Sequence, residues 1–382
     1  MNSKAGQIGP NIPQKTVQLA LRLLVVGCVL GLAGVTGSQA ADNDLYGCIE
    51  IGASGIKAVV VRNHPAASGD EIGTEAVKEY KPQDKNAFKL DATASGRIAT
   101  AVNEIKGQME KDFNLDKDHL FVVGSSGLRE EIQKNLRDTL LQNGLAIDFL
   151  TVDQEAKIEF TAVVPRNRIK QAVSIDIGSG NTKGGCWAAT EPNSEFITFN
   201  VPWGSKTWAE HIDKVRGDTN FLIKADDLHG ELLEAVRTQT QLNPGLQNKP
   251  RLYLSGGIVW ALVTLLKPND SSMLVKLSVA DIDTFCQKAT DDPMTLLNPD
   301  IDESSSSSDS DSANTSKAQS EIARVGTVFS ENQLMAGAII LKTLRDECYF
   351  QRKTAIYFSR NGLYATAIGY VINRLNPPAV SK

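Results

Sequence analysis

Two segments of the chain repeat one arrangement of residues that could bind phosphate and a cation. Gly47–Lys57 and Val173–Lys183 each hold an apolar stretch, an acid, Ile-Gly, small residues and then a lysine. In such Gly/Ser turns, consecutive backbone N–H groups and hydroxyls can surround phosphate oxygens, because glycine allows close approach to the backbone. The acids, Glu50 and Asp176, lie two residues before the first glycine, where a carboxylate can hold a hydrated divalent cation.

A third Gly-rich turn strengthens this interpretation. Ser255-Gly256-Gly257 follows the apolar stretch Arg251–Leu254. One Gly/Ser turn alone is more typical of a plain hairpin. Two turns on one template and a third after another apolar stretch favour a phosphate site.

Strands must position these turns. Leu45–Gly52 and Ile56–Arg62 are β-branched runs on either side of the first turn, and Ala172–Gly178 and Thr182–Ala189 lie on either side of the second. Each strand–turn–strand unit is followed by helical periodicity. The duplication indicates two α/β lobes that face each other across a cleft.

Helices are predicted where apolar residues recur at a spacing of three or four. In Asp91–Asn114 the recurring residues are Ile98, Val102, Ile105 and Met109. Further helices are predicted over Arg129–Gln142 and Gln154–Val163, and Ser330-Glu-Asn-Gln333 is a capping-box pattern that opens a long apolar helix.

Short motifs in this order resemble a known family. The two turns are similar to the phosphate loops of the actin, sugar kinase and heat-shock ATPase superfamily. Ser125-Ser-Gly-Leu-Arg129, Asp153-Gln-Glu-Ala-Lys157 and Val201-Pro-Trp-Gly-Ser205 resemble segments of its exopolyphosphatase / guanosine pentaphosphate phosphatase (Ppx/GppA) branch. The resemblance implies an α/β, two-lobed actin-like (ribonuclease H-like) fold with an inter-lobe cleft. The expected lobes are residues 41–165 and 166–382, with a last helix that can pack back on the first lobe.

The resemblance also implies roles for residues. Glu155 corresponds to the general base that activates water, and Arg129 to a clamp on the transferred phosphoryl group. Asp176 and Glu50 would hold Mg²⁺. The implied phosphate-binding residues are Gly52, Ser54, Lys57, Ser125, Gly178, Ser179, Gly180, Thr182, Lys183, Gly256 and Gly257.

Two residues depart from the family pattern. Glu50 stands where the family has Asp, and Lys183 stands where Ppx/GppA proteins have a Glu that assists catalysis. Lys183 therefore has two interpretations: it binds phosphate directly, or it marks weakened hydrolysis.

The first forty residues read as a signal peptide. An apolar run, Leu23–Val35, precedes Ser38-Gln39-Ala40, a small-x-small cleavage site, and predicts an exported, periplasmic or extracellular protein without a stable membrane span after cleavage. An uncleaved anchor is one alternative. A lipoprotein attached at Cys28 is another, ranked lower because apolar residues follow that cysteine.

The charge and the cysteine content of the chain argue against some classes of ligand. The net charge of −5 gives no general attraction for nucleic acid. Cys48, Cys186, Cys286 and Cys348 form no CxxC pair, so buried thiols are expected rather than a metal cluster. The Ser/Asp-rich segment 302–316 is expected to be a disordered surface loop.

These observations predict a hydrolase of terminal phosphoanhydride bonds, metal-assisted, with polyphosphate or a nucleoside polyphosphate as substrate. Export argues against a cytosolic guanosine nucleotide. Two alternatives stay open: an apyrase-like nucleotidase, and an exported non-catalytic protein that binds or senses a phosphate ligand. A homodimer is also left open.

Overall fold

The structure is a computed structural model, and its contacts group residues 45–382 into one unit. It describes residues 44–52, 55–63, 73–83, 93–128, 130–188, 195–297 and 309–376, with side chains from residue 318 onward in the last range. The sequence-predicted signal segment, residues 1–40, lies outside these ranges.

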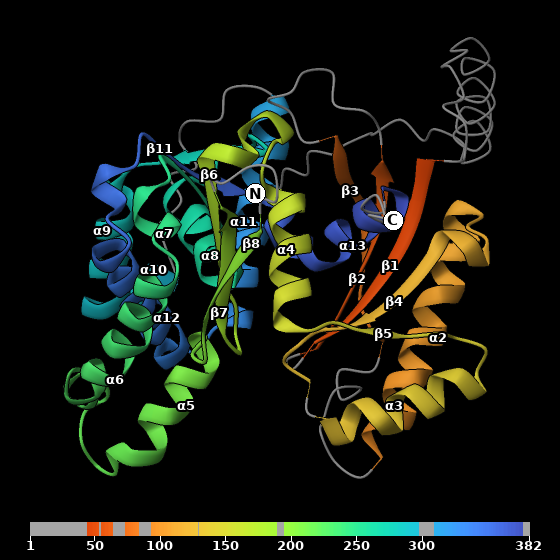
Figure 1. The fold of residues 1–382 in the computed structure, drawn as a ribbon, viewed down its shortest axis with the longest axis horizontal. Coiled ribbons are helices and arrows are strands. Elements are labelled where there is room, and N and C mark those ends of the chain that lie inside the picture. The colour runs from red at the N-terminus through yellow and green to blue at the C-terminus, as the bar shows by residue number, and fades with distance from the viewer. Residues whose placement is uncertain are drawn as a thin grey trace, which may run out of the picture. The chain divides into compact units, whose positions relative to one another are not determined.

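The first sheet has five strands in the order β3-β2-β1-β4-β5 (Figure 1). β1, β2 and β3 form an antiparallel meander, whereas β4 and β5 continue the sheet in parallel from β1. The strands are β1 (Leu45–Gly52), β2 (Gly55–Asn63), β3 (Thr74–Tyr80), β4 (Leu120–Gly124) and β5 (Asp148–Phe149).

The second sheet repeats this topology. β6, β7 and β8 form an antiparallel meander, and β9 and β11 continue in parallel from β6, with β10 added at the edge. The duplicated sequence template therefore corresponds to a duplicated strand order. The strands are β6 (Ala172–Ile177), β7 (Thr182–Trp187), β8 (Phe196–Val201), β9 (Arg251–Ser255), β10 (Leu274–Leu277) and β11 (Ala355–Ser359).

Helices cover both sheets and join them. α4 packs on β7 and β8 and against α13, and α13 packs on β1 and β2, so these two helices lie between the sheets (Figure 1). The helices with described bounds are α2 (Ala94–Phe113), α3 (Glu130–Gln142), α4 (Val152–Val163), α5 (Ser205–Arg216), α6 (Phe221–Leu242), α7 (Gly245–Asn248), α8 (Gly257–Leu266), α9 (Val279–Asp291), α10 (Pro293–Leu297), α11 (Asp309–Val328), α12 (Glu331–Glu347) and α13 (Ala365–Leu375).

The central strands of the first sheet are apolar on both faces because both faces are covered. Ile49 and Val60 pack with the α2 side of the first sheet, whereas Cys48 and Val59 pack with α4 and α13. Successive side chains of a strand point to opposite faces, so a strand covered on both sides must be apolar throughout.

Several predicted elements are confirmed. All four apolar residues predicted for the face of α2 are buried, and the Ser330 capping box opens α12 as expected. The four cysteines are buried, as expected.

Among the helices of the described ranges, none has both the length and the hydropathy of a membrane span.

The Ser/Asp-rich segment differs from its prediction. Instead of a loop throughout residues 302–316, the backbone is helical from Asp309, where α11 begins; residues 302–308 lie outside the described ranges. Ala318, Ile322 and Val325 are buried at helical spacing further along α11. Once such a packed stretch has nucleated a helix, each added residue gains a backbone hydrogen bond, so the helix extends into polar sequence.

The contact between α13 and α4 depends on Gly369. A methyl group there would overlap the carbonyl oxygen of Ile158. We expect Gly369→Ala to lower the free energy of unfolding by about 1–3 kcal/mol, because neither helix can move without disturbing a sheet. Gly230→Ala is the matched control in an exposed part of α6, where no described atom lies within 4 Å of the new methyl group.

The control should gain about 0.5–1 kcal/mol from the better helix propensity of alanine. Urea unfolding of both variants checks the pair. Equal effects would mean that α13 and α4 do not touch at Gly369.

Candidate active site

Each Gly/Ser turn is the end of a hairpin whose acid and lysine are cross-strand partners. In the first hairpin Glu50 lies opposite Lys57, and in the second Asp176 lies opposite Lys183. Opposite residues of an antiparallel pair have their Cβ atoms about 5 Å apart on the same face. The spacing of acid and lysine in the sequence template thus places an acid–lysine pair beside each turn.

Both hairpins open onto one cleft of about 430 Å³. Its lining comes from β1 and β2 in the first sheet, β6 and β7 in the second, and the helices α4, α11 and α13. The residues that matter for its chemistry are Glu50, Gly52, Lys57, Ser125, Glu155, Glu159, Asp176, Gly178, Ser179, Gly180, Lys183, Arg324 and Thr366.

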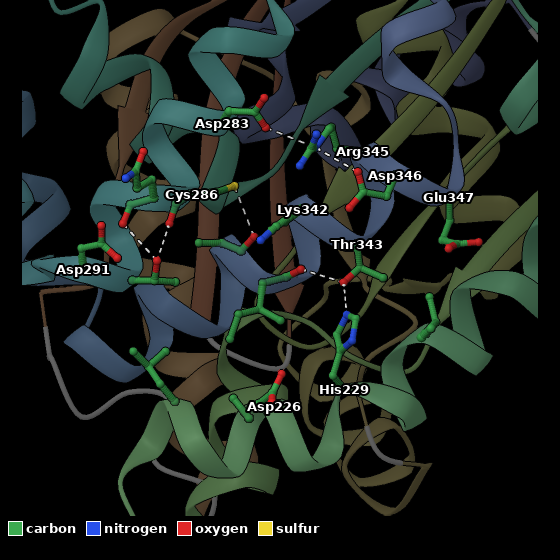
Figure 2. Close-up of a pocket in the computed structure, with 17 residues that line it drawn as sticks. Asp226, His229, Asp283, Cys286, Asp291, Lys342, Thr343, Arg345, Asp346 and Glu347 are labelled. Carbon is green, nitrogen blue, oxygen red and sulfur yellow. Dashed lines mark hydrogen bonds and ion pairs between the residues drawn. The ribbon is translucent and has the colours of Figure 1, made fainter.

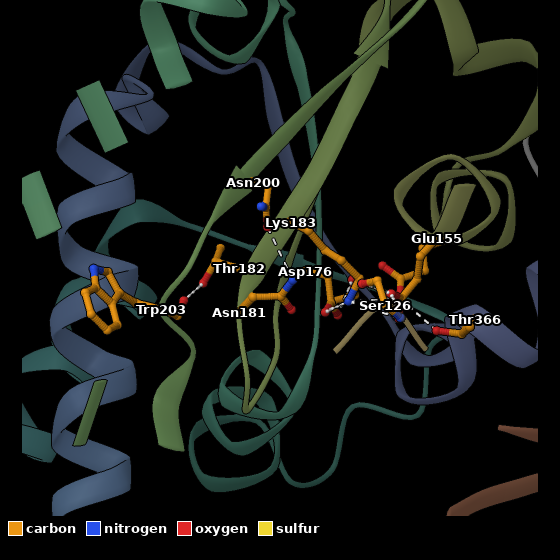
Figure 3. Close-up of polar contacts among 11 residues, drawn as sticks. Ser126, Glu155, Asp176, Asn181, Thr182, Lys183, Asn200, Trp203 and Thr366 are labelled. Atoms are coloured by element: carbon orange, nitrogen blue, oxygen red, sulfur yellow. Dashed lines mark hydrogen bonds and ion pairs between the residues drawn. The ribbon is translucent and has the colours of Figure 1, made fainter. Parts of the chain in front are cut away.

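Lys183 is the centre of a buried charge cluster. Its Nζ lies 3.2 Å from Asp176 Oδ2, 3.2 Å from Glu159 Oε1 and 3.5 Å from Glu155 Oε1. All four residues are between 3% and 8% exposed. In Figure 3 the side chains of Lys183, Asp176 and Glu155 converge between the second sheet and α4.

The start of α4 fixes Glu155. The helix begins at a capping box in which Thr151 and Gln154 satisfy each other's backbone N–H groups. The backbone N–H of Ser126 donates to Glu155 Oε2 at 2.9 Å, and the Ser126 hydroxyl donates to the same oxygen. Glu159 lies one helical turn later and therefore faces the same side.

The remaining carboxylate oxygens are unequally paired. Asp176 Oδ1 accepts from the Ser255 hydroxyl at 3.1 Å, and Glu159 Oε1 accepts from the Thr366 hydroxyl at 2.8 Å. Glu50 Oε2 and Glu159 Oε2 are buried and accept no hydrogen bond from any described residue. These oxygens need a proton or a ligand to be satisfied.

Burial and charge shift the titration of these groups. Burial raises the pKa of Glu50 from its usual value and that of Glu159 well above it. Burial acts to lower the pKa of Lys183, but the charges of Glu159, Glu155 and Asp176 outweigh it and hold that pKa well above its usual value. The charge of Glu50 raises the pKa of Lys57. Both lysines are therefore cationic at neutral pH.

Mg²⁺ was expected at Asp176 and Glu50, and the arrangement of these residues does not fit it. A divalent cation needs several free oxygen ligands, whereas both oxygens of Asp176 are already engaged by Lys183 and Ser255. Across the described ranges, no three His, Cys, Asp or Glu side chains are grouped so that they could hold a metal. The ammonium of Lys183 occupies the space between the carboxylates.

Three of the predicted phosphate-binding residues, Thr182, Gly256 and Gly257, do not line the cleft. Thr182 is fully buried on the opposite face of β7 from Lys183, and its hydroxyl donates to the Trp203 carbonyl at 2.8 Å (Figure 3). Gly256 has a φ of 90°, and a side chain there would overlap the backbone of Ile177, so this glycine serves close packing of β9 against β6.

Two of the predicted residues, Arg129 and Ser54, lie outside the described residues. The other predicted residues, from both hairpins, Ser125 and α4, line the cleft together. Their roles in chemistry remain predictions.

Several residues that line the cleft were not predicted from the sequence. Glu159 had a signal, because it lies four residues after Glu155 on a predicted helix. Thr366 and Arg324 had none, since they come from α13 and α11, far away in the sequence. Arg324 pairs with Glu79 of β3 at 3.0 Å and so ties α11 to the first sheet at the cleft.

A larger cavity of about 680 Å³ lies elsewhere, between α6, α9 and α12 (Figure 2). Some of its charged and polar groups are paired with one another: Arg345 lies 3.2 Å from both Asp283 and Asp346, and His229 contacts the Thr343 hydroxyl at 3.1 Å. Helices rather than strand ends form it, and neither hairpin reaches it. The smaller cleft is therefore the candidate site.

No sequence-family model matches the chain, and no curated protein sequence matches it. Solved structures do. A Ppx/GppA family member from Aquifex aeolicus has a TM-score of 0.58 at 13% identity, with 87% of this chain and 99% of that chain covered. An exopolyphosphatase from Cytophaga hutchinsonii has a TM-score of 0.53 at 12% identity, with 87% and 98% covered. An exopolyphosphatase-like protein has a TM-score of 0.56 at 17% identity over 87% and 98%.

These similarities confirm the predicted fold. The chain has the α/β, two-lobed actin-like architecture that the Ppx/GppA structures share, over nearly its whole described length.

Proposed function

We propose that this chain is a phosphohydrolase that removes the terminal phosphate of polyphosphate or a nucleoside polyphosphate in the cleft between its two hairpins. The observation that carries the proposal is that Glu155 and both Gly/Ser turns line the same cleft. The fold, shared with structures named as exopolyphosphatases, supports the same reaction class.

In this reaction a water molecule attacks the terminal phosphorus, and the bond from that phosphorus to the bridging oxygen breaks. Glu155 takes the proton of the water, and orthophosphate leaves from a chain shortened by one phosphate. The N–H groups of the turns at Gly52 and Gly180 would surround the charged oxygens, whereas the Gly178 N–H already donates to the Asn181 carbonyl at 3.1 Å. On the sequence alone, Arg129 is proposed as the clamp on the transferred group.

One cation that is open to the cleft is Lys57. It lies on β2 beside the first turn, with an exposed side chain, whereas Lys183 is buried among carboxylates. A phosphate chain entering the cleft would therefore meet Lys57 first. Lys81, also exposed, lines the same cleft.

We further propose that the protein acts outside the cytoplasm. The support is the small-x-small site at Ser38-Gln39-Ala40 after an apolar run. Polyphosphate and extracellular nucleotides are the substrates that this location favours. N-terminal sequencing of the exported protein, expected to begin near Ala41, tests it.

A second candidate is binding without hydrolysis. The observation in its favour is that Glu155 already accepts hydrogen bonds from Ser126 and lies 3.5 Å from the Lys183 ammonium. Both carboxylate oxygens of Glu155 are therefore already occupied by donors of the protein itself. In this case the cleft would hold a phosphate ligand as a sensor or carrier does.

A phosphate-release screen separates the two candidates. The full chain is incubated with polyphosphate, a nucleoside triphosphate and a phosphate monoester, each with and without Mg²⁺. Release from the first two and not from the monoester supports hydrolysis of phosphoanhydrides. Tight binding of polyphosphate with no release under any condition supports the sensor.

We expect Lys57→Ala to weaken the binding of tripolyphosphate about tenfold. A hydrogen bond to a charged group contributes about 1.5 kcal/mol or more, and about 1.4 kcal/mol corresponds to a tenfold change in Kd. Titration calorimetry measures it. Lys276→Ala, at an exposed position of β10 outside the cleft, is the matched control and should bind like the wild type. Equal affinities in the two variants would exclude Lys57 from the binding surface.

A further inference from the structure

The positive charge among the buried carboxylates of the cleft is the side chain of Lys183. We infer that the Lys183 ammonium replaces the divalent metal ion at the carboxylate cluster, so that the apo protein has no resident Mg²⁺ site and the cleft receives its phosphate ligand without one. The part of this inference that concerns the ligand rests on the proposed function. The part that concerns the metal does not.

Most oxygens of the clustered carboxylates already have partners within the protein. Asp176 is bound through both oxygens, and Glu155 through Oε1 to Lys183 and through Oε2 to Ser126. The unpartnered oxygens, Glu50 Oε2 and Glu159 Oε2, belong to different elements, β1 and α4. A metal ion with several protein ligands here would have to displace the ammonium.

The Lys183 ammonium is held in place by its strand and by its burial. Lys183 lies within β7, directly opposite Asp176 in the register with β6, and its side chain is buried. Its neighbours hold it in the charged form, since the three carboxylates around it each attract the ammonium. A dication placed among the same carboxylates would face a fixed like charge at short range, which low-dielectric surroundings make strongly unfavourable.

The two hairpins share the same acid–lysine arrangement. Both carry a lysine opposite the acid that precedes the turn, so each acid has its own cation from the same strand pair. The carboxylates that a metal would otherwise neutralise are thus matched to ammonium groups by the fold. Because Lys57 is exposed, a phosphate ligand would share its charge with Glu50 and would otherwise depend on backbone N–H groups.

The test is direct binding of Mn²⁺, as a spectroscopic substitute for Mg²⁺, to the full chain without substrate. Electron paramagnetic resonance counts the free ion. We expect no saturable site in the wild type below about 10 mM, and a site with a Kd of about 1 mM or tighter in Lys183→Met, a change of at least tenfold. Lys183→Glu, which adds a ligand as well, should bind still more tightly.

Lys81→Met is the matched control, because it removes a positive charge from the exposed rim of the same cleft without opening the cluster. It should bind Mn²⁺ no better than the wild type. A gain equal to that of Lys183→Met would reduce the effect to general electrostatics and overturn the inference. So would a saturable wild-type site with a Kd below about 10 mM, since weak divalent sites bind at about 0.1–1 mM.

Thermal melting gives a second readout if Lys183→Met folds poorly. Its Tm should rise with added Mg²⁺, because an ion that binds only the native state stabilises it, whereas the wild-type Tm should not change. An unchanged Tm in a variant that is folded, together with no Mn²⁺ binding, would contradict the inference. Failure of the wild type to release phosphate would refute the proposed hydrolysis and leave these ion-binding results standing.

Discussion

Glu155→Gln is expected to lower the rate of phosphate release by about 10²–10⁴-fold, the range typical of a lost general base. The Kd for tripolyphosphate should be nearly unchanged. Glutamine has almost the same shape and can still accept from Ser126 through its carbonyl oxygen, but it cannot take a proton from water. Single-turnover phosphate release and titration calorimetry separate the two quantities.

Two neighbouring carboxylates serve as controls for this result. Asp153 lies in the first turn of the same helix and is exposed, so Asp153→Asn should leave turnover unchanged. Glu159 lies one turn further along and in the same cluster. If Glu159→Gln abolished release and Glu155→Gln did not, the base would be Glu159, and our assignment would be wrong.

Lys183→Met is expected to lower the free energy of unfolding by about 3–5 kcal/mol, the range for breaking a buried ion pair by removing one partner. The physical reason is that Asp176, Glu155 and Glu159 would lose their common counter-ion while still buried. Guanidinium unfolding in metal-free buffer measures the loss.

A double-mutant cycle identifies the source of this effect. If the loss comes from uncompensated carboxylates, Asp176→Asn should cancel part of the damage, so that the double variant Asp176→Asn/Lys183→Met is less destabilised than the sum of the two single changes. Lys276→Met on an exposed position of β10 should have little effect. Additive losses for Asp176 and Lys183 would show that the pair is not coupled.

The sequence alone determined the hairpins, helices and caps of this protein, because these depend on residues close together in the chain. The acid–Gly–Lys template occurs twice, and local β-propensity makes each copy a hairpin, so the two-lobed fold and its duplicated topology could be predicted. The periodicity of α2 and the Ser330 capping box likewise depend on residues close together in the chain. Such signals are readable because strand and helix periods fix which side chains share a face.

Contacts between residues far apart in the sequence could not be predicted from these local patterns. Thr182 and Gly256 have the residue types of a phosphate loop, but their contacts are with Trp203 and Ile177, which only the packed sheet brings near. The sequence also predicted a loop over residues 302–316, whereas α11 begins at Asp309, because helix extension there depends on the buried stretch further along the chain.

Lys183 shows most clearly which properties the sequence determines and which depend on the tertiary structure. The sequence identified it as a departure from the family pattern and left two interpretations open. Only the tertiary structure decided that its ammonium lies among Asp176, Glu155 and Glu159, because that position requires β7 and α4 to pack together across the cleft. The charge of a residue is fixed by its type, but the charges that surround it are fixed by the fold.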